Sequence, residues 1–297
     1  MKLCSTTDIR RCRPLLGTLV EVAAWHADPA RAHVAVDAAF AQIECVQRLM
    51  GFHDPRSEVS HLNQFAARRA MHVSAETWRV LQAACELHKC TGGVFDVAVA
   101  PELMRWGLLP RHLFGRADVD GDGRTSDIVL LPHQRVQFSR PLLIDLGGLA
   151  KGFAVDCAVE ALQASGITAG LVNAGGDLRC FGEREQQIWV RHPKICGLLV
   201  ALPELKNGAL ATSANSYQRW RRRGRTICAH IHGWTRLPCL RSFSVSVRAR
   251  TCLIADALTK VVLALGEAAS AVLKEYSAIS YIVPADGRMT CCGEGAA

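Results

Sequence analysis

The chain has 297 residues, of which 49% are hydrophobic and 21% charged, and its formal net charge is +8. This composition indicates a soluble globular protein with a sizeable core, and we expect a single domain over residues 1–297. A membrane-spanning protein is excluded, because the longest apolar run late in the chain, Val261 to Leu265, is far too short to cross a bilayer. The positive charge suits an anionic ligand.

The N-terminal residues and the cysteines both bear on location. Met1 to Ser5 lead straight into the basic segment Arg10 to Arg13, without the apolar stretch of an export signal. The thirteen cysteines are odd in number and form no C-x-x-C pair, so a reduced chain is the simplest account. Cys291 and Cys292 are adjacent and could oxidise or bind metal, although composition favours free thiols. We therefore expect a cytoplasmic protein.

Apolar periodicity predicts the first elements in chain order. Leu15 to Ala24 alternates as a strand, and Ala30 to Met50 has the spacing of a long amphipathic helix that ends before Gly51. The next predicted elements are a short helix or turn from Ser57 to Phe65, a helix from Ser74 to about Lys89, a helical or looped segment from Val97 to Trp106, and a strand from Ile128 to Leu131. Ser57 and Ser74 are candidate N-caps, since a serine oxygen can accept a free amide of the first turn.

An acidic segment from Asp118 to Gly123 resembles the opening of a calcium loop. Acids stand at its positions one, three and five, and glycine at position six. Val129 occupies the position where a calcium loop needs a bidentate glutamate. A solvated acidic loop is therefore the favoured interpretation, with weak cation binding as the minor alternative.

The most informative segment begins at Leu143. An apolar strand is predicted to deliver Asp145 into a turn made by Gly147 and Gly148, and Lys151 follows within reach of a phosphate. Glycines let backbone groups approach a ligand closely. The turn stands at the start of a predicted helix, where free amides and the helix dipole favour an anion.

A second glycine turn follows that helix. Gly166 ends the helix, Ile167 to Val172 forms another apolar run, and Asn173 to Asp177 reads N-A-G-G-D. The strand–turn–helix–strand–turn unit therefore carries two turns that join glycines to an acid. Together they predict a small-molecule site.

These two turns resemble the core signature of the FAD:protein FMN transferases, the ApbE-type flavin transferases, in which a D-L-G-x-x-A-K-G-x-x-x-D block precedes an N-x-G-G-D turn. Five further blocks in the order of that family extend the resemblance over nearly the whole chain. They are Leu16-Gly17-Thr18, Phe52 to Asn63, Thr91 to Gly107, Ala211-Thr212-Ser213 with Tyr217, and Ser244 to Val247 with Ala255 to Leu258. Seven blocks in one order are a specific signal, whereas a lone glycine motif is weak.

The resemblance implies an α+β fold, with a mixed sheet, packed helices and a smaller lobe, and with the ligand in the cleft between. It also implies Mg²⁺-dependent transfer of FMN from FAD to a Thr or Ser hydroxyl of an acceptor flavoprotein, with release of AMP. FAD and the acceptor are then the expected partners. The alternative is an FAD-binding protein or slow FAD hydrolase with an altered metal site.

The resemblance assigns residues to roles. His230 is the candidate base, because imidazole titrates closest to neutrality. Asp256 and the backbone carbonyl of Gly148 would position Mg²⁺, and Lys151 and Lys260 can face phosphate. The residues expected to bind FAD are Leu16, His53, Val94, Phe95, Asp96, Asp145, Lys151, Asp177 and His232.

Two departures from the family pattern concern the expected chemistry. The family carries H-I-I-D-P-x-T-G before its last strand, but residues 230–236 read H-I-H-G-W-T-R, so the histidine is kept and the aspartate is not. In the family's A-D-A-x-x-T element a threonine binds magnesium, but Lys260 stands at that position and Thr259 one residue early. An ammonium is only a donor and cannot ligate a cation. Either the metal site is altered, or Lys260 itself supplies the positive charge.

A basic cluster from Arg219 to Arg225 surrounds Trp220. Arginines with an interleaved aromatic residue are typical of nucleic-acid contacts, so a nucleic-acid-binding module is a minor alternative. The same residues also fit a solvated basic hairpin tip beside the flavin site. We expect the hairpin and no nucleic acid.

Overall fold

The computed structural model describes residues 7–110, 122–215, 219–222 and 224–293. Within them the largest sheet has eight strands, in the order β1-β2-β6-β7-β10-β13-β14-β15. The strands are β1 (Thr7–Leu15), β2 (Thr18–His26), β6 (Ala169–Ala174), β7 (Asp177–Phe181), β10 (Gly208–Ala214), β13 (Ser244–Ala249), β14 (Ile279–Val283) and β15 (Thr290–Gly293). The α+β class is confirmed. Every pairing in this sheet is antiparallel, where a mixed sheet was expected.

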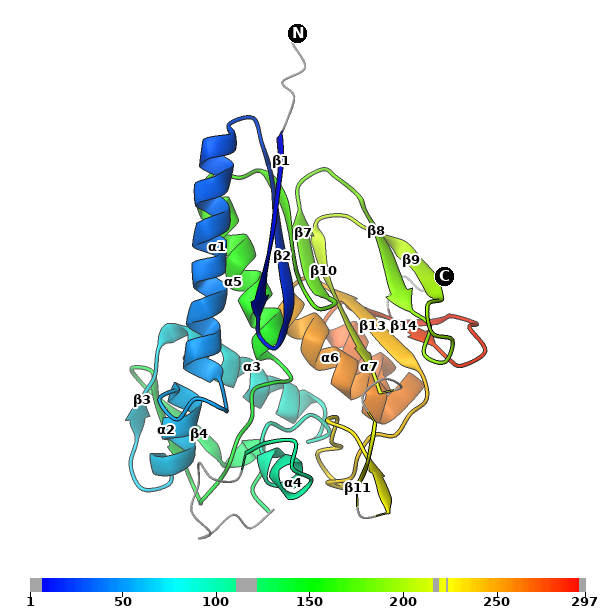
Figure 1. Cartoon of the computed structure of the whole chain (residues 1–297). Helices are drawn as coiled ribbons and strands as arrows, with labels where there is room; N and C mark the ends of the chain where they lie inside the picture. The colour runs from blue at the N-terminus through cyan, green and yellow to red at the C-terminus, as the bar shows by residue number, and fades with distance from the viewer. Residues whose placement is uncertain (1–6, 111–121, 216–218, 223, 294–297) are drawn as a thin grey trace.

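Helices cover one face of the sheet and a hairpin covers the other. The helices α1 (Pro29–Met50), α5 (Ala150–Ala164) and α6 (Cys252–Leu265) lie side by side in Figure 1. Because side chains alternate along a strand, Val20 and Val22 pack on the helix side, whereas Ala23 and Trp25 face the opposite layer. That layer is the hairpin of β8 (Gln186–Arg191) and β9 (Leu199–Leu205). The central strands of the sheet are therefore buried on both faces, whereas the edge strands β1 and β15 are partly exposed.

The predicted long helix is confirmed as α1. Asp28 caps it by accepting the amides of Ala30 and Arg31 at 2.9 and 3.3 Å, and Pro29 occupies the first turn, where no amide is needed. Gly51 ends it, as expected. Among the residues that the structure describes, no helix combines the length and the apolar character needed to cross a membrane.

A smaller lobe lies below α1 and α5 in Figure 1. Ser57 and Ser74 cap its first two helices by accepting the amides of Ser60 and Thr77, so both predicted caps are confirmed. The predicted strand from Ile128 to Leu131 is also confirmed. The lobe contains α2 (Glu58–Phe65), α3 (Ala75–Cys90), α4 (Ala100–Arg105), the short 3₁₀ turn η1 (Thr125–Asp127), and a sheet of β3 (Met71–His72), β5 (Arg135–Phe138) and β4 (Ile128–Leu131) in that order.

Two predicted strands differ in the structure. The first was expected from Leu15 to Ala24, but a turn at Leu16 and Gly17, with φ of 55° and 70°, divides that segment between β1 and β2. The apolar segment before Asp145 forms no strand. The amide of Asn63 takes the place of a neighbouring strand there, accepting the N–H of Ile144 at 2.8 Å and donating to its carbonyl at 3.0 Å.

The remaining elements are the connection from α6 to β14 and the basic hairpin. The 3₁₀ turn η2 (Gly266–Ala269) and α7 (Ser270–Glu275) connect α6 to β14, and β11 (Trp220–Arg222) pairs with β12 (Arg225–Ile227). The expected hairpin is confirmed, and its arginines at 221, 222 and 225 are exposed. Arg223, Tyr217, the N-terminal Met1 to Ser5 and most of the acidic segment, 118–121, lie outside the described residues.

Candidate functional site

A cavity of about 450 Å³ lies between the smaller lobe and the main sheet, within the size range of small-molecule sites. Loops and element ends from both parts of the chain form its wall. These are the β1–β2 turn (Leu16, Gly17, Thr18), the segment around α4 (Val94, Phe95, Asp96, Val97, Val99, Leu103, Leu108, Leu109), the turn into α5 (Asp145, Gly147, Gly148, Lys151), the β6–β7 turn (Ala174, Gly175), the end of β10 (Thr212, Ser213, Ala214), the segment after β12 (Ala229, His230, Ile231), and Lys260 of α6.

Close backbone approach brings α5 and α6 together at this cavity. A Cβ atom at Gly152 would lie 2.3 Å from the carbonyl oxygen of Cys252, so only glycine fits there. The amide of Gly152 instead donates to Asp256 Oδ2 at 3.2 Å. This contact fixes Lys151, the preceding residue, against the start of α6.

Four charged side chains meet where α5, β7 and α6 converge. The Lys151 ammonium donates to Asp177 and lies 3.9 Å from Asp256 Oδ2. The Lys260 ammonium donates to Asp256 Oδ1 and, at 2.9 Å, to the backbone carbonyl of Asp256 one helical turn earlier. The aspartate side chains are almost fully buried, whereas 36% of Lys151 and 19% of Lys260 remain exposed at the cavity wall. The cavity therefore presents the two cations, with the carboxylates behind them.

The ionisation of this cluster follows from burial and pairing. Burial opposes ionisation of Asp256, but the cations of Lys151 and Lys260 outweigh it and lower its pKa. Burial and the nearby charge of Asp256 raise the pKa of Asp177. Burial disfavours the charged form of Lys151, yet Asp256 and Asp177 together raise its pKa, so the ammonium persists at neutral pH. Burial also raises the pKa of Asp145, whose Oδ1 accepts the Gly147 amide at 3.2 Å.

The donors around Asp256 do not fit the expected magnesium ion. The Thr259 hydroxyl donates to the Asp256 carbonyl at 2.7 Å and pairs with Ser213 at 2.8 Å, so it does not face the carboxylate. The carbonyl thus accepts from Thr259 and from Lys260. Within the described ranges, no three His, Cys, Asp or Glu side chains are placed to hold a metal ion. An ammonium stands where a hard cation would need oxygen ligands.

His230 is held as a neutral imidazole with one ring nitrogen free. The buried Asn215 donates its amide N–H to the Cys239 carbonyl. This hydrogen bond orients the side chain of Asn215 so that its Oδ1 faces His230 Nδ1. Nδ1 must then carry the proton and donate, leaving Nε2 as an acceptor. Burial, followed by the charges of Lys260 and Lys151, lowers the His230 pKa to about 3. At neutral pH the imidazole is therefore unprotonated at Nε2.

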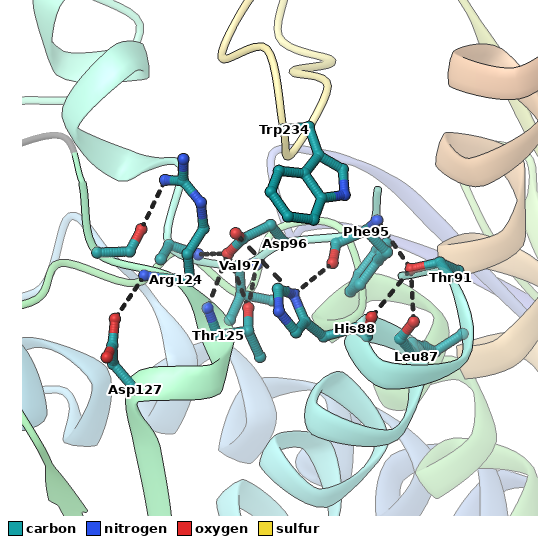
Figure 2. Close-up of polar contacts among 12 residues, drawn as sticks. Leu87, His88, Thr91, Phe95, Asp96, Val97, Arg124, Thr125, Asp127 and Trp234 are labelled. Carbon is teal, nitrogen blue, oxygen red and sulfur yellow. Dashed lines mark hydrogen bonds and ion pairs between the residues drawn. The ribbon is translucent and has the colours of Figure 1, made fainter. Parts of the chain in front are cut away.

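Asp96 belongs to a different network, drawn in Figure 2. Its Oδ1 accepts the amides of Ala98 and Thr125 at 2.8 and 3.1 Å and the Thr125 hydroxyl at 2.8 Å. Its Oδ2 lies 3.2 Å from Arg236 and 3.9 Å from His88. The carboxylate is fully buried, so it ties the Phe95 loop to η1 and to the 230–236 segment.

The family model for the ApbE family matches residues 16–293 of the 297. This chain belongs to the ApbE family. It is 28% identical to the FAD:protein FMN transferase of Vibrio cholerae over 76% of this chain and 71% of that protein. It is 29% identical to that of Rhodobacter capsulatus over 88% of this chain, and it spans about half the length of that relative.

Solved structures of ApbE proteins share this fold. The flavin transferase ApbE from Vibrio cholerae superposes with a TM-score of 0.80 over 97% of this chain and 98% of its own. The ApbE protein of Thermotoga maritima gives 0.81 over 97% of both chains. Each is 24% identical to this chain, so these likenesses show the fold.

The structure brings together most of the residues that the resemblance to the ApbE family selects. Nine line the cavity: Leu16, Val94, Phe95, Asp96, Asp145, Gly148, Lys151, His230 and Lys260. Asp177 and Asp256 lie directly behind the two lysines. His53 is exposed and outside the cavity wall. His232 also lies outside it, because its Nδ1 accepts the Trp234 amide at 3.2 Å in a local turn.

Two groups at this ApbE-family site were not selected from the sequence. Thr212 and Ser213 line the cavity. They stand in a block that resembles the family, but that block was given no role. No motif in the sequence around Asn215 indicates its role. Asn215 acts by accepting a hydrogen bond from His230, which lies fifteen residues later and beyond an intervening hairpin.

Proposed function

We propose that this chain is an FAD:protein FMN transferase, which moves FMN from FAD to a Thr or Ser hydroxyl of an acceptor flavoprotein and releases AMP. In this reaction the hydroxyl oxygen forms a bond to the phosphorus of the FMN half. The bond from that phosphorus to the bridging oxygen breaks, and AMP leaves with the electron pair. The hydroxyl proton passes to a base. The curated relatives carry this activity in their names, and the composition of the cavity wall supports the proposal.

The observation that carries the proposal is the pairing of a fixed double cation with a neutral imidazole in one cavity. Lys151 and Lys260 stabilise negative charge on a diphosphate, and preorganised charges of this kind are a large term in phosphoryl transfer. The helix α5 starts without a side-chain cap, but the amide of Ala150 donates to the Leu146 carbonyl at 2.8 Å and that of Gly152 to Asp256 Oδ2 at 3.2 Å, so the two ammonium groups are the main donors to an anion here. Loops from both lobes supply the apolar remainder of the wall.

His230 is the base in this proposal. Because Asn215 engages Nδ1, Nε2 is the ring nitrogen that can accept a proton. The low pKa of His230 reflects burial and two neighbouring cations, and the negative charge of a bound diphosphate would oppose the effect of those cations. The imidazole then becomes a stronger acceptor when substrate is bound. General-base assistance of this kind contributes roughly 10²- to 10⁴-fold to a rate.

The Mg²⁺ that the resemblance implies is not assigned a step. Asp256 and Gly148 were the expected ligands, but Lys260 already occupies the Asp256 oxygens. The proposed location is cytoplasmic, as supported by the cysteines, every one of which is free among the residues described. Both lobes line the cavity, and we propose that they act as one domain.

The test is to incubate the purified protein with FAD and an acceptor domain that carries a Thr or Ser flavinylation motif. Mass spectrometry of the acceptor and chromatography of nucleotides are the measurements. Added FMN mass with equimolar AMP is the expected result. AMP and free FMN without labelling would identify the FAD hydrolase alternative, and intact bound FAD would contradict an enzyme acting on this acceptor.

A further inference from the structure

The ammonium of Lys260 is fixed in position by its own helix. It donates to the carboxylate and to the backbone carbonyl of Asp256, four residues earlier on α6. An ammonium has three N–H donors, so one remains for a ligand. Lys260 lines the cavity opposite Gly148, where an added Cβ would lie 3.8 Å from Lys260 Cε. The cation is thus held at the cavity wall before any ligand arrives.

Each Asp256 oxygen around this ammonium already accepts at least one hydrogen bond. Both lone pairs of the Asp256 carbonyl are used, one by Thr259 and one by Lys260. Asp256 Oδ1 accepts from Lys260, while Oδ2 accepts the Gly152 amide and faces Lys151. The two aspartates and two lysines also balance in formal charge. A divalent cation would have to displace Lys260 and would leave a buried excess of positive charge.

We propose that the Lys260 ammonium replaces a divalent cation as the group that binds the diphosphate of FAD, so that this chain works without a bound metal ion. The proposal rests on the proposed function. As the bridging oxygen leaves with its electron pair, the Lys260 hydrogen bond stabilises the developing charge, and Lys260 itself transfers no proton. The hydroxyl proton goes to His230 Nε2.

The experiment measures FAD binding by flavin fluorescence and, separately, the rate of FMN transfer. Each is measured in excess EDTA and across a Mg²⁺ titration. For the wild-type chain, both the FAD affinity and the transfer rate are expected to be the same in EDTA and in Mg²⁺. A wild-type chain that loses FAD affinity or transfer in EDTA and regains it with Mg²⁺ overturns the proposal and leaves the transferase function standing.

Three variants sharpen the test. Lys260→Met removes the charge without adding a ligand and is expected to weaken FAD binding about 10- to 100-fold under both conditions, the loss of one charge-assisted hydrogen bond. Lys260→Thr places a hydroxyl one turn after Asp256. This variant is expected to bind FAD weakly in EDTA and to regain its affinity when Mg²⁺ is added. Lys274→Thr changes an exposed lysine on α7 and is the matched control, with no expected effect.

The two proposals fail separately. A wild-type chain that binds FAD equally in EDTA and in Mg²⁺ but labels no acceptor contradicts the transferase function and retains the role of Lys260. If Lys260→Met binds FAD as tightly as wild type, the role of Lys260 is refuted whatever the transfer assay shows. Circular dichroism confirms that each variant is folded, and the wild-type comparison in EDTA needs no variant.

Discussion

Asp96 and Asp256 are both buried aspartates paired with cations, and they differ in what their partners do. Asp96 accepts two amides and a hydroxyl, and its cation, Arg236, does not line the cavity. Asp256 is paired with Lys151 and Lys260, which both line it. Neither carboxylate has exposed surface. Asp256 therefore places two cations on the cavity wall, whereas the cation paired with Asp96 holds the surrounding loops together.

The largest effect is expected on the cavity side, from His230→Gln. Glutamine can still donate to Asn215 but cannot take a proton, so the transfer rate should fall about 10²- to 10⁴-fold. The free energy of unfolding at pH 7 should change little, because the histidine is neutral there. Transfer kinetics and urea unfolding of the same preparation measure both. Retention of more than a tenth of the rate would remove His230 from the role of base.

The Asp96 network is expected to respond in the opposite way. Asp96→Ala leaves the Arg236 guanidinium buried without its carboxylate, and its Nε and Nη1 atoms already have no hydrogen-bond partner among the described residues. Breaking such a pair costs about 3–5 kcal/mol of unfolding free energy. The folded fraction should still bind FAD, as measured by fluorescence at low temperature. Asp96→Asn, which keeps an acceptor oxygen, is the control and should lose less.

If Asp96→Ala abolished FAD binding while leaving the unfolding midpoint unchanged, the distinction between the two aspartates would be wrong. Asp96 would then be a ligand-binding group, as the sequence resemblance implied.

A smaller effect on stability is expected from pH. The unfolded chain protonates His230 near its ordinary pKa of 6.5, whereas the folded chain keeps it neutral down to about 3. Stability from this group is therefore complete above pH 6.5 and is lost as the pH falls from 6.5 towards 3. Between pH 6.5 and 5 the loss is about 1–2 kcal/mol. Urea unfolding at both pH values should show a shallower loss for His230→Gln, and equal losses would contradict a neutral histidine in the folded chain.

Local signals in the sequence were enough for much of the fold. Ser57, Ser74 and Gly51 act within one helical turn, so helix ends could be predicted from neighbouring residues. The strand β1 was missed because Arg11 and Arg13 stand at its partly buried positions, where an apolar residue would signal a strand, and its pairing with β2 defines it. The antiparallel order also depends on distant partners, such as β2 with β6.

The site residues that have a local sequence signal were also predicted, whereas contacts between distant residues were not. Lys151 and Asp177 belong to glycine turns that carry their own signature, and the structure brings them into contact. His232 was selected from the resemblance to the ApbE family, but in the 230–236 segment its Nδ1 accepts the Trp234 amide. The contact between Lys260 and the Asp256 oxygens depends on side-chain geometry along α6. The spacing of the two residues could not choose between an altered metal site and a lysine that supplies the positive charge.

The residues that line the cavity lie between Leu16 and Lys260 in the sequence and come from several separate segments of the chain. During synthesis the double cation cannot assemble until α6 has emerged from the ribosome and docked on α5 through Gly152. A nascent chain that has completed the smaller lobe still lacks Lys260 and His230. The double cation can therefore form only after α6 is in place, whereas α7, β14 and β15, which follow it in the chain, contribute no residue to the cavity wall.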